Sequence, residues 1–346
     1  MNAAVLTSTK KIEMQQTAIP VPKEDEVLIR LRAVGVCGSD VHYYEHGKIG
    51  RYVVEKPIIL GHEASGEIVK TGANVPPHLQ AGQRVAIEPG ATCGKCEYCT
   101  SGRYNLCPHV EFLATPPYDG VFSEYAVVRA DLVFPIPDDM SFETAALIEP
   151  FSVGLHAVRR GELQAGETVV IMGMGPIGLL TAANAKLAGA KTVIGVDLEQ
   201  GRLDAALKLG ATHVVNLRQY DLQEKVAEIT AGQGVDVAIE TAGNPKAVQG
   251  AIAAVKRGGR VVVVGMSPQD EVPVNMSLIV DSELDLRGVF RYHDTYPAAI
   301  EILSRKTIDI EQIITGKYAL NETAAAFEKA LGDKTNTLKL MVYPSL

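Results

Sequence analysis

The sequence predicts an α/β protein built from a β-rich domain followed by a doubly wound parallel sheet. Three observations support this. A chain of 346 residues exceeds the size that one hydrophobic core usually serves, so two domains are expected. The first 150 residues carry short branched runs separated by Gly, Pro and Asn. From Thr168 onward, strands rich in Val and Ile alternate with helical stretches.

The first domain is predicted over residues 1–150 as a barrel-like or sandwich-like β structure. Its strands are expected in the runs EVLIRLRAVGV, ASGEIVKTG, QRVAIEPG and FSEYAVVRADLVFPIP. Turn-forming residues interrupt these runs at short intervals, as they do in antiparallel β domains.

The second domain is predicted over residues 151–292 as a parallel sheet of about six strands covered by helices. TVVIMG reads as a buried strand, and PIGLLTAANAKLAG as a helix with Pro near its start and Gly at its end. KTVIGVD, HVVN, DVAIETAG, GRVVVVG and LDLRGVF supply the later strands. Residues 293–346 do not continue this alternation of strands and helices, and we expect them to pack back onto the first domain.

Composition narrows the possible functions. The formal net charge of −8 argues against a nucleic-acid partner, which favours a basic surface. No apolar run approaches the length needed to cross a bilayer. The N-terminal MNAAVLTSTKKIEMQQ lacks the apolar region of a signal peptide, so a cytoplasmic location is expected. Clustered cysteines in a reducing compartment indicate metal ligands or redox groups.

A glycine loop, GMGPIG, lies between the first strand and first helix of the second domain. Its glycines are Gly173, Gly175 and Gly178. A bare G-x-G-x-x-G is equally compatible with a simple tight turn, but the strand–loop–helix setting favours a dinucleotide site. Small residues let the backbone approach a pyrophosphate, and the helix N-terminus stabilises its charge.

An acidic residue, Asp197, ends the second strand nineteen residues after Gly178. Its carboxylate can accept hydrogen bonds from a ribose diol and would repel a 2′-phosphate, as would Glu199, so NAD is favoured over NADP. Arg202 is expected along the adenine ribose. The alternative is that Asp197 is an ordinary helix N-cap.

Three further side chains in the β domain are of the types that bind zinc. Cys37 offers a thiolate, His62 an imidazole and Glu63 a carboxylate. Taken singly, Cys37 reads as a small buried residue and His62 as a core histidine. Glu149, in LIEPFSVGLH, stands where the first domain meets the second.

The remaining four cysteines form the pattern C-x₂-C-x₂-C-x₇-C, which is a strong metal-binding signal. A closed tetrahedral zinc site fits the ligand number. An iron–sulfur cluster is the main rival, although its last spacing is usually three residues. A redox C-x-x-C lacks the βαβ setting that such motifs need. With all four thiolates bound, a metal here has no open position. The cysteines are Cys93, Cys96, Cys99 and Cys107.

Read together, the motifs resemble the zinc-dependent medium-chain dehydrogenases, and most closely their sorbitol and xylitol dehydrogenase branch. The motifs, in order, are VCGSDVHYY, GHEASGEIV, RVAIEPG, GRYNLC, ATPP, ALIEPFSVGLHA, GMGPIG and GVFRY. The resemblance implies a GroES-like catalytic domain, a Rossmann cofactor domain and an active site between them. It also implies oxidation of a polyol to a ketose by NAD, two zinc ions per chain and a homotetramer.

The resemblance also implies roles for individual residues. Cys37, His62 and Glu63 would hold the catalytic zinc, with Glu149 holding a zinc-bound water or becoming a ligand itself. Ser39 and His42 would relay the proton through the cofactor ribose to solvent. The four-cysteine cluster would hold a structural zinc.

The polyol pocket and the cofactor contacts follow in the same way. The residues expected to line the pocket are Tyr43, Phe112, Thr115, Arg291 and Tyr292. The cofactor contacts are expected at Gly173, Gly175, Pro176, Ile177, Gly178, Asp197, Arg202, Val264, Gly265, Met266, Val289, Phe290 and Arg291. Met174 replaces the small residue usual in the glycine loop, and we expect its side chain to point away from the phosphates.

Two alternatives remain open at this point. The same fold can act on another secondary alcohol, such as a butanediol or threonine. A non-catalytic module that binds NAD and zinc is the alternative of a different class, and the complete set of zinc-ligand types argues against it.

Overall fold

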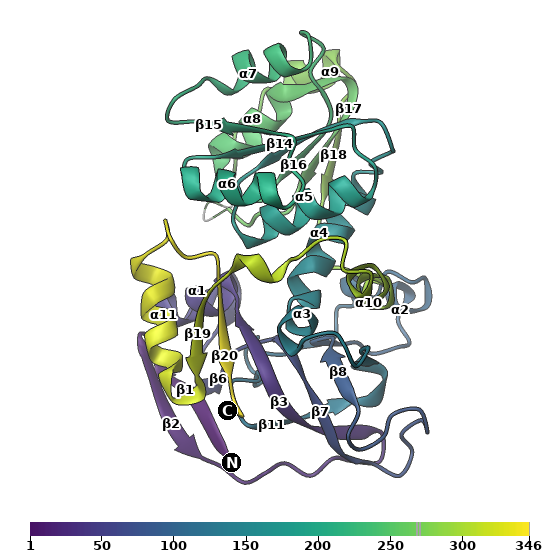
Figure 1. Ribbon diagram of the computed structural model, residues 1–346, viewed down its shortest axis with the longest axis vertical. Coiled ribbons are helices and arrows are strands. Elements are labelled where there is room, and N and C mark those ends of the chain that lie inside the picture. The colour runs from purple at the N-terminus through teal and green to yellow at the C-terminus, as the bar shows by residue number, and fades with distance from the viewer. Residues whose placement is uncertain (268, 270, 346) are drawn as a thin grey trace. The chain divides into compact units, whose positions relative to one another are not determined.

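The chain divides into two units in the computed structural model, which describes residues 1–267, 269 and 271–345. The first unit combines Met1–Glu149 with Tyr296–Leu346, and the second is Pro150–Thr295. Figure 1 shows the elements of both units along the chain. The predicted α/β fold class is confirmed, with a mixed β sheet in one unit and a parallel sheet in the other.

A seven-stranded sheet organises the first unit. Its order is β12-β8-β7-β3-β20-β19, with β11 also paired to β3. The long central strand β3 is buried along most of its length, because its apolar residues face neighbours on both sides. The strands are β3 (Glu26–Val36), β7 (Glu63–Thr71), β8 (Arg84–Ile87), β11 (Tyr125–Arg129), β12 (Val133–Pro135), β19 (Ile314–Ala319) and β20 (Lys339–Tyr343).

Smaller elements complete this unit. One sheet joins β2, β1 and β6, and two hairpin-like pairs are β4–β5 and β9–β10. The strands are β1 (Asn2–Ser8), β2 (Lys11–Gln16), β4 (Lys48–Ile49), β5 (Tyr52–Val53), β6 (Ile58–Ile59), β9 (Gly90–Ala91) and β10 (Glu111–Phe112). The helices are α1 (Gly38–His46), α2 (Glu97–Thr100), α3 (Phe142–Ala146), α10 (Tyr296–Ser304) and α11 (Thr323–Gly332). Four 3₁₀ helices are η1 (Tyr104–Leu106), η2 (Ala130–Leu132), η3 (Glu311–Ile313) and η4 (Leu320–Glu322).

The C-terminal segment packs into the core of the first unit. Phe327 on α11 contacts the rings of Tyr44 and Phe122, at centroid distances of 5.1 and 5.7 Å. Tyr296 at the start of α10 is buried, and its hydroxyl donates to the carbonyl of Ile87 over 2.7 Å. The last strand, β20, pairs antiparallel with β3 and so reaches the end of β3 that precedes α1.

The second unit is a six-stranded parallel sheet in the order β15-β14-β13-β16-β17-β18, as the sequence predicts. The strand order reverses direction at β13, and ligands of doubly wound sheets bind at such a switch point. The strands are β13 (Thr168–Met172), β14 (Thr192–Asp197), β15 (His213–Asn216), β16 (Val235–Glu240), β17 (Val255–Val263) and β18 (Asp285–Gly288).

Helices cover this sheet, with α5 packed beside α6 and α7 beside α8. Their apolar faces form a core with the Val- and Ile-rich strands. The helices are α5 (Pro176–Leu187), α6 (Gln200–Lys208), α7 (Leu222–Ile229), α8 (Pro245–Ala254) and α9 (Met276–Asp281), and α4 (Ile148–Arg160) runs from the first unit into the second. Among the described residues, no helix is long and apolar enough to cross a membrane.

Candidate active site and metal centres

Three predicted zinc ligands converge in the first unit. One ligand atom from each of Cys37, His62 and Glu63 lies within 4.8 Å of the others. Cys37 follows β3, His62 precedes β7 and Glu63 opens β7, and the two strands pair with Gly35 opposite Glu63. The strand pairing therefore brings residues 26 positions apart to one point. A thiolate, an imidazole and a carboxylate at this spacing fit a zinc ion.

A buried carboxylate that the sequence analysis did not single out orients this group. Asp40 is fully buried on α1, and its Oδ1 lies 3.4 Å from His62 Nδ1. The same carboxylate accepts the N–H groups of Gly61 and Cys37 over 3.0 and 3.1 Å. Such a carboxylate fixes the orientation of a metal-binding imidazole. Asp40 is the third residue of α1, so the spacing C-x-x-D was a local signal for it.

The charges around His62 create a site that attracts a cation. Burial alone would lower the pKa of His62, but Asp40 and then Cys37 raise that pKa well above its ordinary value. Without a metal, the favoured cation is a proton on His62. Because a metal ligand must be deprotonated, a metal ion binding here displaces that proton.

A buried lysine, also absent from the sequence predictions, holds Glu63. Lys339 Nζ donates to both carboxylate oxygens of Glu63 over 2.7 and 2.8 Å, and to the carbonyl of Val36 over 3.2 Å. Burial lowers the pKa of Lys339, but the charges of Glu63 and Cys37 outweigh burial and raise it. The lysine is therefore charged, and each oxygen of Glu63 already accepts one hydrogen bond.

Gly35 makes room for that carboxylate. A Cβ added at Gly35 would lie 2.1 Å from Glu63 Oε2, which is far inside any real contact. A side chain at position 35 would therefore displace Glu63 from Lys339.

The remaining predicted catalytic residues of this unit lie on α1 and α4. Glu149 is buried in the first turn of α4 and lies outside the convergent group of three ligands, although its charge contributes to the raised pKa of Lys339. Ser39 is half-buried and His42 is exposed, both on α1. The ring of His42 lies 4.6 Å from that of His46.

Three predicted pocket residues also belong to this unit. Tyr43 and Phe112 are buried, and Thr115 is half-buried. The ring of Phe112 lies 5.5 Å from that of His62, so this residue borders the convergent ligands directly.

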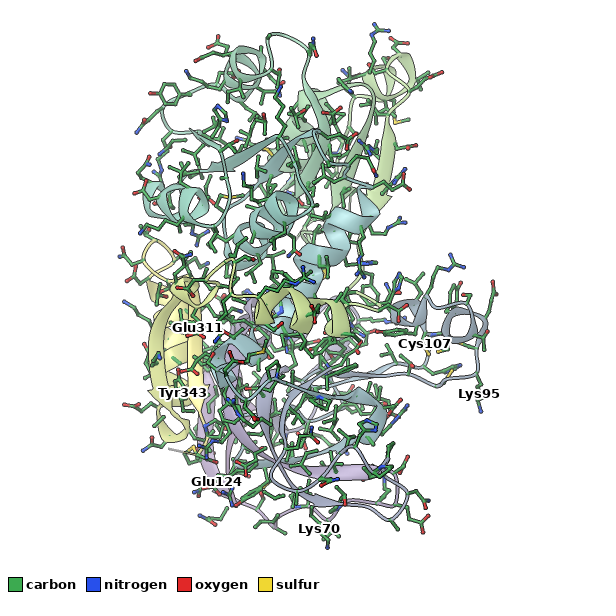
Figure 2. All side chains as sticks on the ribbon, turned by 45° about the vertical axis from the view of Figure 1, so that its right-hand side comes forward. Lys70, Lys95, Cys107, Glu124, Glu311 and Tyr343 are labelled. Carbon is green, nitrogen blue, oxygen red and sulfur yellow. The ribbon has the colours of Figure 1, made fainter. Side chains whose placement is uncertain are left out.

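The four cysteines form a second metal-binding group in a lobe that runs from β9 to β10. Their sulfurs all lie within 4.8 Å of one another, with Cys96 and Cys93 at 3.4 and 3.9 Å from Cys99. A tetrahedral ion with Zn–S bonds near 2.3 Å places its sulfurs about 3.8 Å apart, so a single ion fits. The N–H groups of Lys95 and Cys96 lower the pKa of Cys93 to about 6. Figure 2 labels Lys95 and Cys107 in this lobe.

In the second unit, the glycine loop connects β13 to α5 with its backbone tightly folded. Gly173 has φ 94°, which favours glycine. A Cβ added at Gly178 would lie 1.8 Å from the carbonyl oxygen of Gly173, so helix and loop approach as closely as the motif requires. Pro176 starts α5, and Ile177 is half-buried in its first turn.

Asp197 ties the glycine loop to the end of β14. Its Oδ2 accepts the N–H of Met174 over 2.7 Å, and its Oδ1 accepts the N–H groups of Leu198 and Glu199. The N-cap residue of α6 is Glu199, so Asp197 is not that helix's cap. Arg202 Nη1 lies 3.9 Å from the Asp197 carboxylate.

Met174 is fully buried, and its sulfur would lie 2.9 Å from a Cβ added at Gly195 in β14. The side chain therefore packs onto the sheet.

The other predicted cofactor and substrate residues of this unit lie after β17 and β18. The N–H groups of Val264 and Gly265 donate to the carbonyl of Glu240 over 2.8 and 3.1 Å, and Met266 is exposed. Val289 donates to the carbonyl of Val263 over 2.9 Å.

The segment after Val289 includes a residue in the left-handed region. Arg291 has φ 54°, a conformation that non-glycine residues adopt uncommonly. Its guanidinium lies 4.8 Å from the ring centroid of Phe290, which is half exposed, while Tyr292 is buried.

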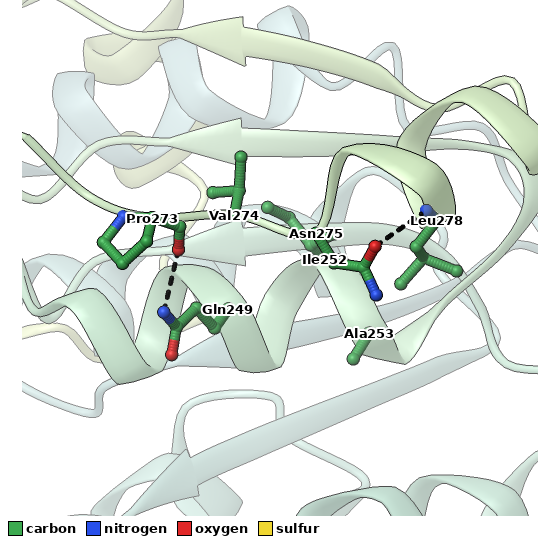
Figure 3. Close-up of a pocket in the computed structure, with 7 residues that line it drawn as sticks. All are labelled: Gln249, Ile252, Ala253, Pro273, Val274, Asn275 and Leu278. Atoms are coloured by element: carbon green, nitrogen blue, oxygen red, sulfur yellow. Dashed lines mark hydrogen bonds between the residues drawn. The ribbon is translucent and has the colours of Figure 1, made fainter.

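A cavity of about 370 Å³ lies elsewhere in the second unit, between α8 and the chain that leads into α9. Figure 3 shows two hydrogen bonds among its lining residues: the side-chain amide of Gln249 donates to the carbonyl of Pro273, and the N–H of Leu278 donates to the side chain of Asn275. None of the predicted site residues lines this cavity, so it is not the candidate active site. Its lining residues are Gln249, Ile252, Ala253, Pro273, Val274, Asn275 and Leu278.

Comparison with known proteins gives consistent results for both units. An alcohol dehydrogenase GroES-like domain matches residues 23–138, and a zinc-binding dehydrogenase domain matches residues 176–305. Sorbitol dehydrogenase from Bacillus subtilis (strain 168) is 54% identical over 345 residues, covering 100% of this chain and 98% of that protein.

Solved structures agree over the full length. An oxidoreductase/dehydrogenase of unknown specificity from Escherichia coli superposes with a TM-score of 0.96 at 36% identity, covering 100% of this chain and 99% of that one. 2R,3R-butanediol dehydrogenase from Bacillus subtilis has a TM-score of 0.91 at 33% identity, covering 99% of each chain.

Proposed function

The chain belongs to the zinc-dependent medium-chain dehydrogenases, in the branch that includes the sorbitol dehydrogenases. From this premise, we propose that it oxidises a sorbitol- or xylitol-type polyol to the corresponding ketose and transfers the hydride to NAD. The observation that carries this proposal is the convergence of Cys37, His62 and Glu63 within 4.8 Å in a chain that is 54% identical to a sorbitol dehydrogenase.

In this proposal Cys37, His62 and Glu63 hold the catalytic zinc. A zinc ion held there supplies Lewis-acid chemistry that lowers the pKa of a substrate hydroxyl. Asp40 keeps the His62 ring in place through its contact with Nδ1. Lys339 leaves each Glu63 oxygen with unused acceptor capacity, so that Glu63 can hold the ion and the lysine together. Glu149 holds a water or completes the ligand set.

Ser39 and His42 accept and pass on the proton that leaves the substrate hydroxyl. Burial lowers the pKa of His42, and the charge of His46 lowers it further, so its imidazole is neutral near neutral pH and can accept a proton. The exposed position of His42 then lets that proton reach solvent.

We propose Tyr43, Phe112, Thr115, Arg291 and Tyr292 as the residues that contact the polyol. Hydroxyl and guanidinium donors suit a chain of hydroxyl groups better than they suit an apolar alcohol.

The fold provides for a nicotinamide dinucleotide, and we propose NAD rather than NADP. The cofactor supplies the hydride acceptor when bound. Gly173, Gly175, Pro176, Ile177 and Gly178 cradle its pyrophosphate at the start of α5. Asp197 and Glu199 place two carboxylates beside the ribose, where they repel a 2′-phosphate. Further contacts come from Arg202, Val264, Gly265, Met266, Val289 and Phe290.

We assign a second, structural zinc to the four cysteines. Their sulfurs are spaced for one tetrahedral ion, whereas a multi-iron cluster spreads its thiolates over several irons. Two zinc ions per chain by elemental analysis are expected. Iron with a visible absorption band near 400 nm would refute this assignment.

The closest rival is oxidation of another secondary alcohol, since the 2R,3R-butanediol dehydrogenase shares the whole fold. Initial rates with sorbitol, xylitol, ribitol, 2,3-butanediol and threonine, each with NAD⁺ and NADP⁺, decide between these. The proposal expects the highest kcat/KM with a polyol and NAD⁺. The proposal is overturned if butanediol or threonine is oxidised far faster than every polyol. A protein that binds NADH but oxidises none of these substrates would instead be a non-catalytic module.

A homotetramer and a cytoplasmic location complete the proposal. Light scattering tests the first, with an expected mass about four times the 37.0 kDa of one chain. The second is supported by the five cysteines, none of which forms a disulfide and all of which we propose as metal ligands.

A further inference from the structure

A buried carboxylate at the switch point of the parallel sheet is not used by the mechanism above. Glu240 is the last residue of β16, the strand that pairs with β13 opposite the glycine loop. It is fully buried. A charged group is rarely retained at such a position unless the surrounding groups stabilise it.

Backbone N–H groups surround this side chain. Glu240 Oε1 accepts the N–H groups of Ala242 and Gly243, each over 2.7 Å. Burial raises the pKa of Glu240 above its ordinary value, and the N–H groups of Gly243, Ala242, Asn244 and Gly265 limit that rise without reversing it. Two short bonds to one oxygen and two further N–H dipoles form a nest of the kind that binds anions. The carboxylate fills this nest from within the chain.

The nest joins the loops that the proposed cofactor would contact. A Cβ added at Gly265 would lie 2.2 Å from the nitrogen of Gly243 and 2.8 Å from Glu240 Oε2. A Cβ at Gly243 would lie 2.5 Å from the carbonyl oxygen of Met266. The loops 241–244 and 264–266 therefore meet backbone to backbone around the Glu240 carboxylate.

The same cluster reaches the glycine loop. Ala242 lies against Gly173, where an added Cβ would come within 2.9 Å of the Ala242 Cβ. Thr241 donates its hydroxyl to the carbonyls of Met172 and Gly173 over 3.1 and 2.9 Å. Residues 173–178, 241–244 and 264–266 are thus held as one assembly at the carboxyl end of the sheet, where dinucleotides bind.

We propose that Glu240 is a positioning residue with two effects on the cofactor, an inference that rests on the proposed function. Its carboxylate holds these loops in register with the glycine loop, and its negative charge at the switch point favours NAD⁺, whose nicotinamide ring is cationic, over NADH, whose ring is neutral. Because the carboxylate occupies the nest of residues 242 and 243, the pyrophosphate is left to the glycine loop.

The test compares the dissociation constants of NAD⁺ and NADH without any substrate. NADH binding is followed by its fluorescence, and NAD⁺ binding by competition with NADH. Glu240→Gln keeps an oxygen for the N–H groups of Ala242 and Gly243 but removes the charge. We expect NAD⁺ to bind about tenfold more weakly, because one charge acting across a short distance in the protein is lost, while NADH changes less than about threefold.

Glu240→Asp provides the complementary variant, because it keeps the charge but is too short to reach both N–H groups. It should weaken NAD⁺ and NADH together and leave their ratio unchanged. Glu228→Gln is the matched control, since Glu228 is an exposed carboxylate of the same unit that forms an ion pair with Lys225. This variant should bind both forms of the cofactor like the wild type.

The outcomes separate the inference from the proposed function. If the wild type binds neither NAD⁺ nor NADH, the proposed function fails. If the wild type binds both and Glu240→Gln changes neither, or changes both equally, the charge effect is refuted. If Glu240→Gln does not fold, the ratio measured with Glu240→Asp still decides, because a ratio that moves despite the retained charge contradicts the inference.

Discussion

Replacing Lys339 by Met removes one partner of the most deeply buried ion pair at the proposed catalytic centre. The side chains of Lys339 and Glu63 are 3% and 1% exposed, so neither charge can be solvated after the change. Breaking a buried pair in this way costs about 3–5 kcal/mol, because an uncompensated charge remains inside the protein. The carbonyl of Val36 also loses its N–H donor. We therefore expect the metal-free first unit to lose about 3–5 kcal/mol of stability.

Zinc should reduce that loss. A divalent cation held by Cys37, His62 and Glu63 replaces the positive charge that Lys339 supplied to Glu63. The zinc-loaded variant is therefore expected to lose less stability than the metal-free variant, and by linkage its affinity for zinc should rise. A role of Lys339 in packing alone would reduce stability equally in both states.

Hydrogen exchange of the amides in β3, β7 and β20 is the appropriate assay. Two units and the absence of tryptophan make a single global unfolding curve hard to assign. Lys317→Met is the matched control, because Lys317 is 62% exposed beside Glu143 and should cost less than about 1 kcal/mol. The double variant Glu63→Gln with Lys339→Met should recover much of the loss. A loss below about 1 kcal/mol without metal, or an equal loss with and without zinc, would refute the reasoning.

Three further changes test the assignments separately. Cys37→Ala should lower kcat by at least about a thousandfold and leave one zinc per chain by elemental analysis. Cys93→Ser should also retain one zinc but keep most of the activity. Equal activity in the two variants would contradict the assignment of the sites. Asp197→Ala should reduce the NAD⁺/NADP⁺ ratio of kcat/KM at least about tenfold, and an unchanged ratio would limit Asp197 to holding the glycine loop. His156 is buried, and burial, followed by the charge of His293, lowers its pKa to about 4. Because the folded protein favours neutral His156, the unfolded state binds a proton at higher pH than the folded state does. The free energy of unfolding therefore decreases as the pH falls from 6.5 towards 4, by roughly 2 kcal/mol at pH 5. His156→Leu should flatten this part of the pH dependence of stability, measured by hydrogen exchange of amides in the second unit, and a parallel pH dependence in both proteins would contradict it.

Features encoded by local spacing were predictable from the sequence. The six strands of the second unit follow from a repeated strand–helix rhythm, and the structure confirms their number. The four cysteines lie within fifteen residues, so their convergence needs little tertiary information. By contrast, the order of strands in the first unit depends on pairing between distant segments. The placement of β20 beside β3 joins residues about 300 positions apart.

Asp40, Lys339 and Glu240 were not predicted from the sequence, and they differ in how strong a local sequence signal each one has. Asp40 stands three residues after Cys37, so a carboxylate in the first turn of α1 was a usable signal. Lys339 stands 276 residues from Glu63, and its only local signal is a lysine at the start of the apolar run KLMVY. Glu240 likewise ends the apolar strand VDVAIE. In both strands the informative feature is a charged residue where burial is expected, because such a residue needs a partner.

The two metal groups differ in what holds their ligands before a metal arrives. At the catalytic group, Asp40 positions His62 and Lys339 positions Glu63, and these partners come from the sheet and helix of the first unit. The ligands are therefore arranged by the fold itself, which lets a metal enter, exchange or share its coordination with a substrate without rebuilding the site. In the four-cysteine lobe, all four sulfurs lie within 4.8 Å of one another, and at such distances several thiolates repel unless a cation lies between them. We therefore expect the lobe to depend on its metal for order more than the proposed catalytic group does. This difference supports the proposed assignment of the chemistry to Cys37, the cysteine that stands apart from the other four in the sequence.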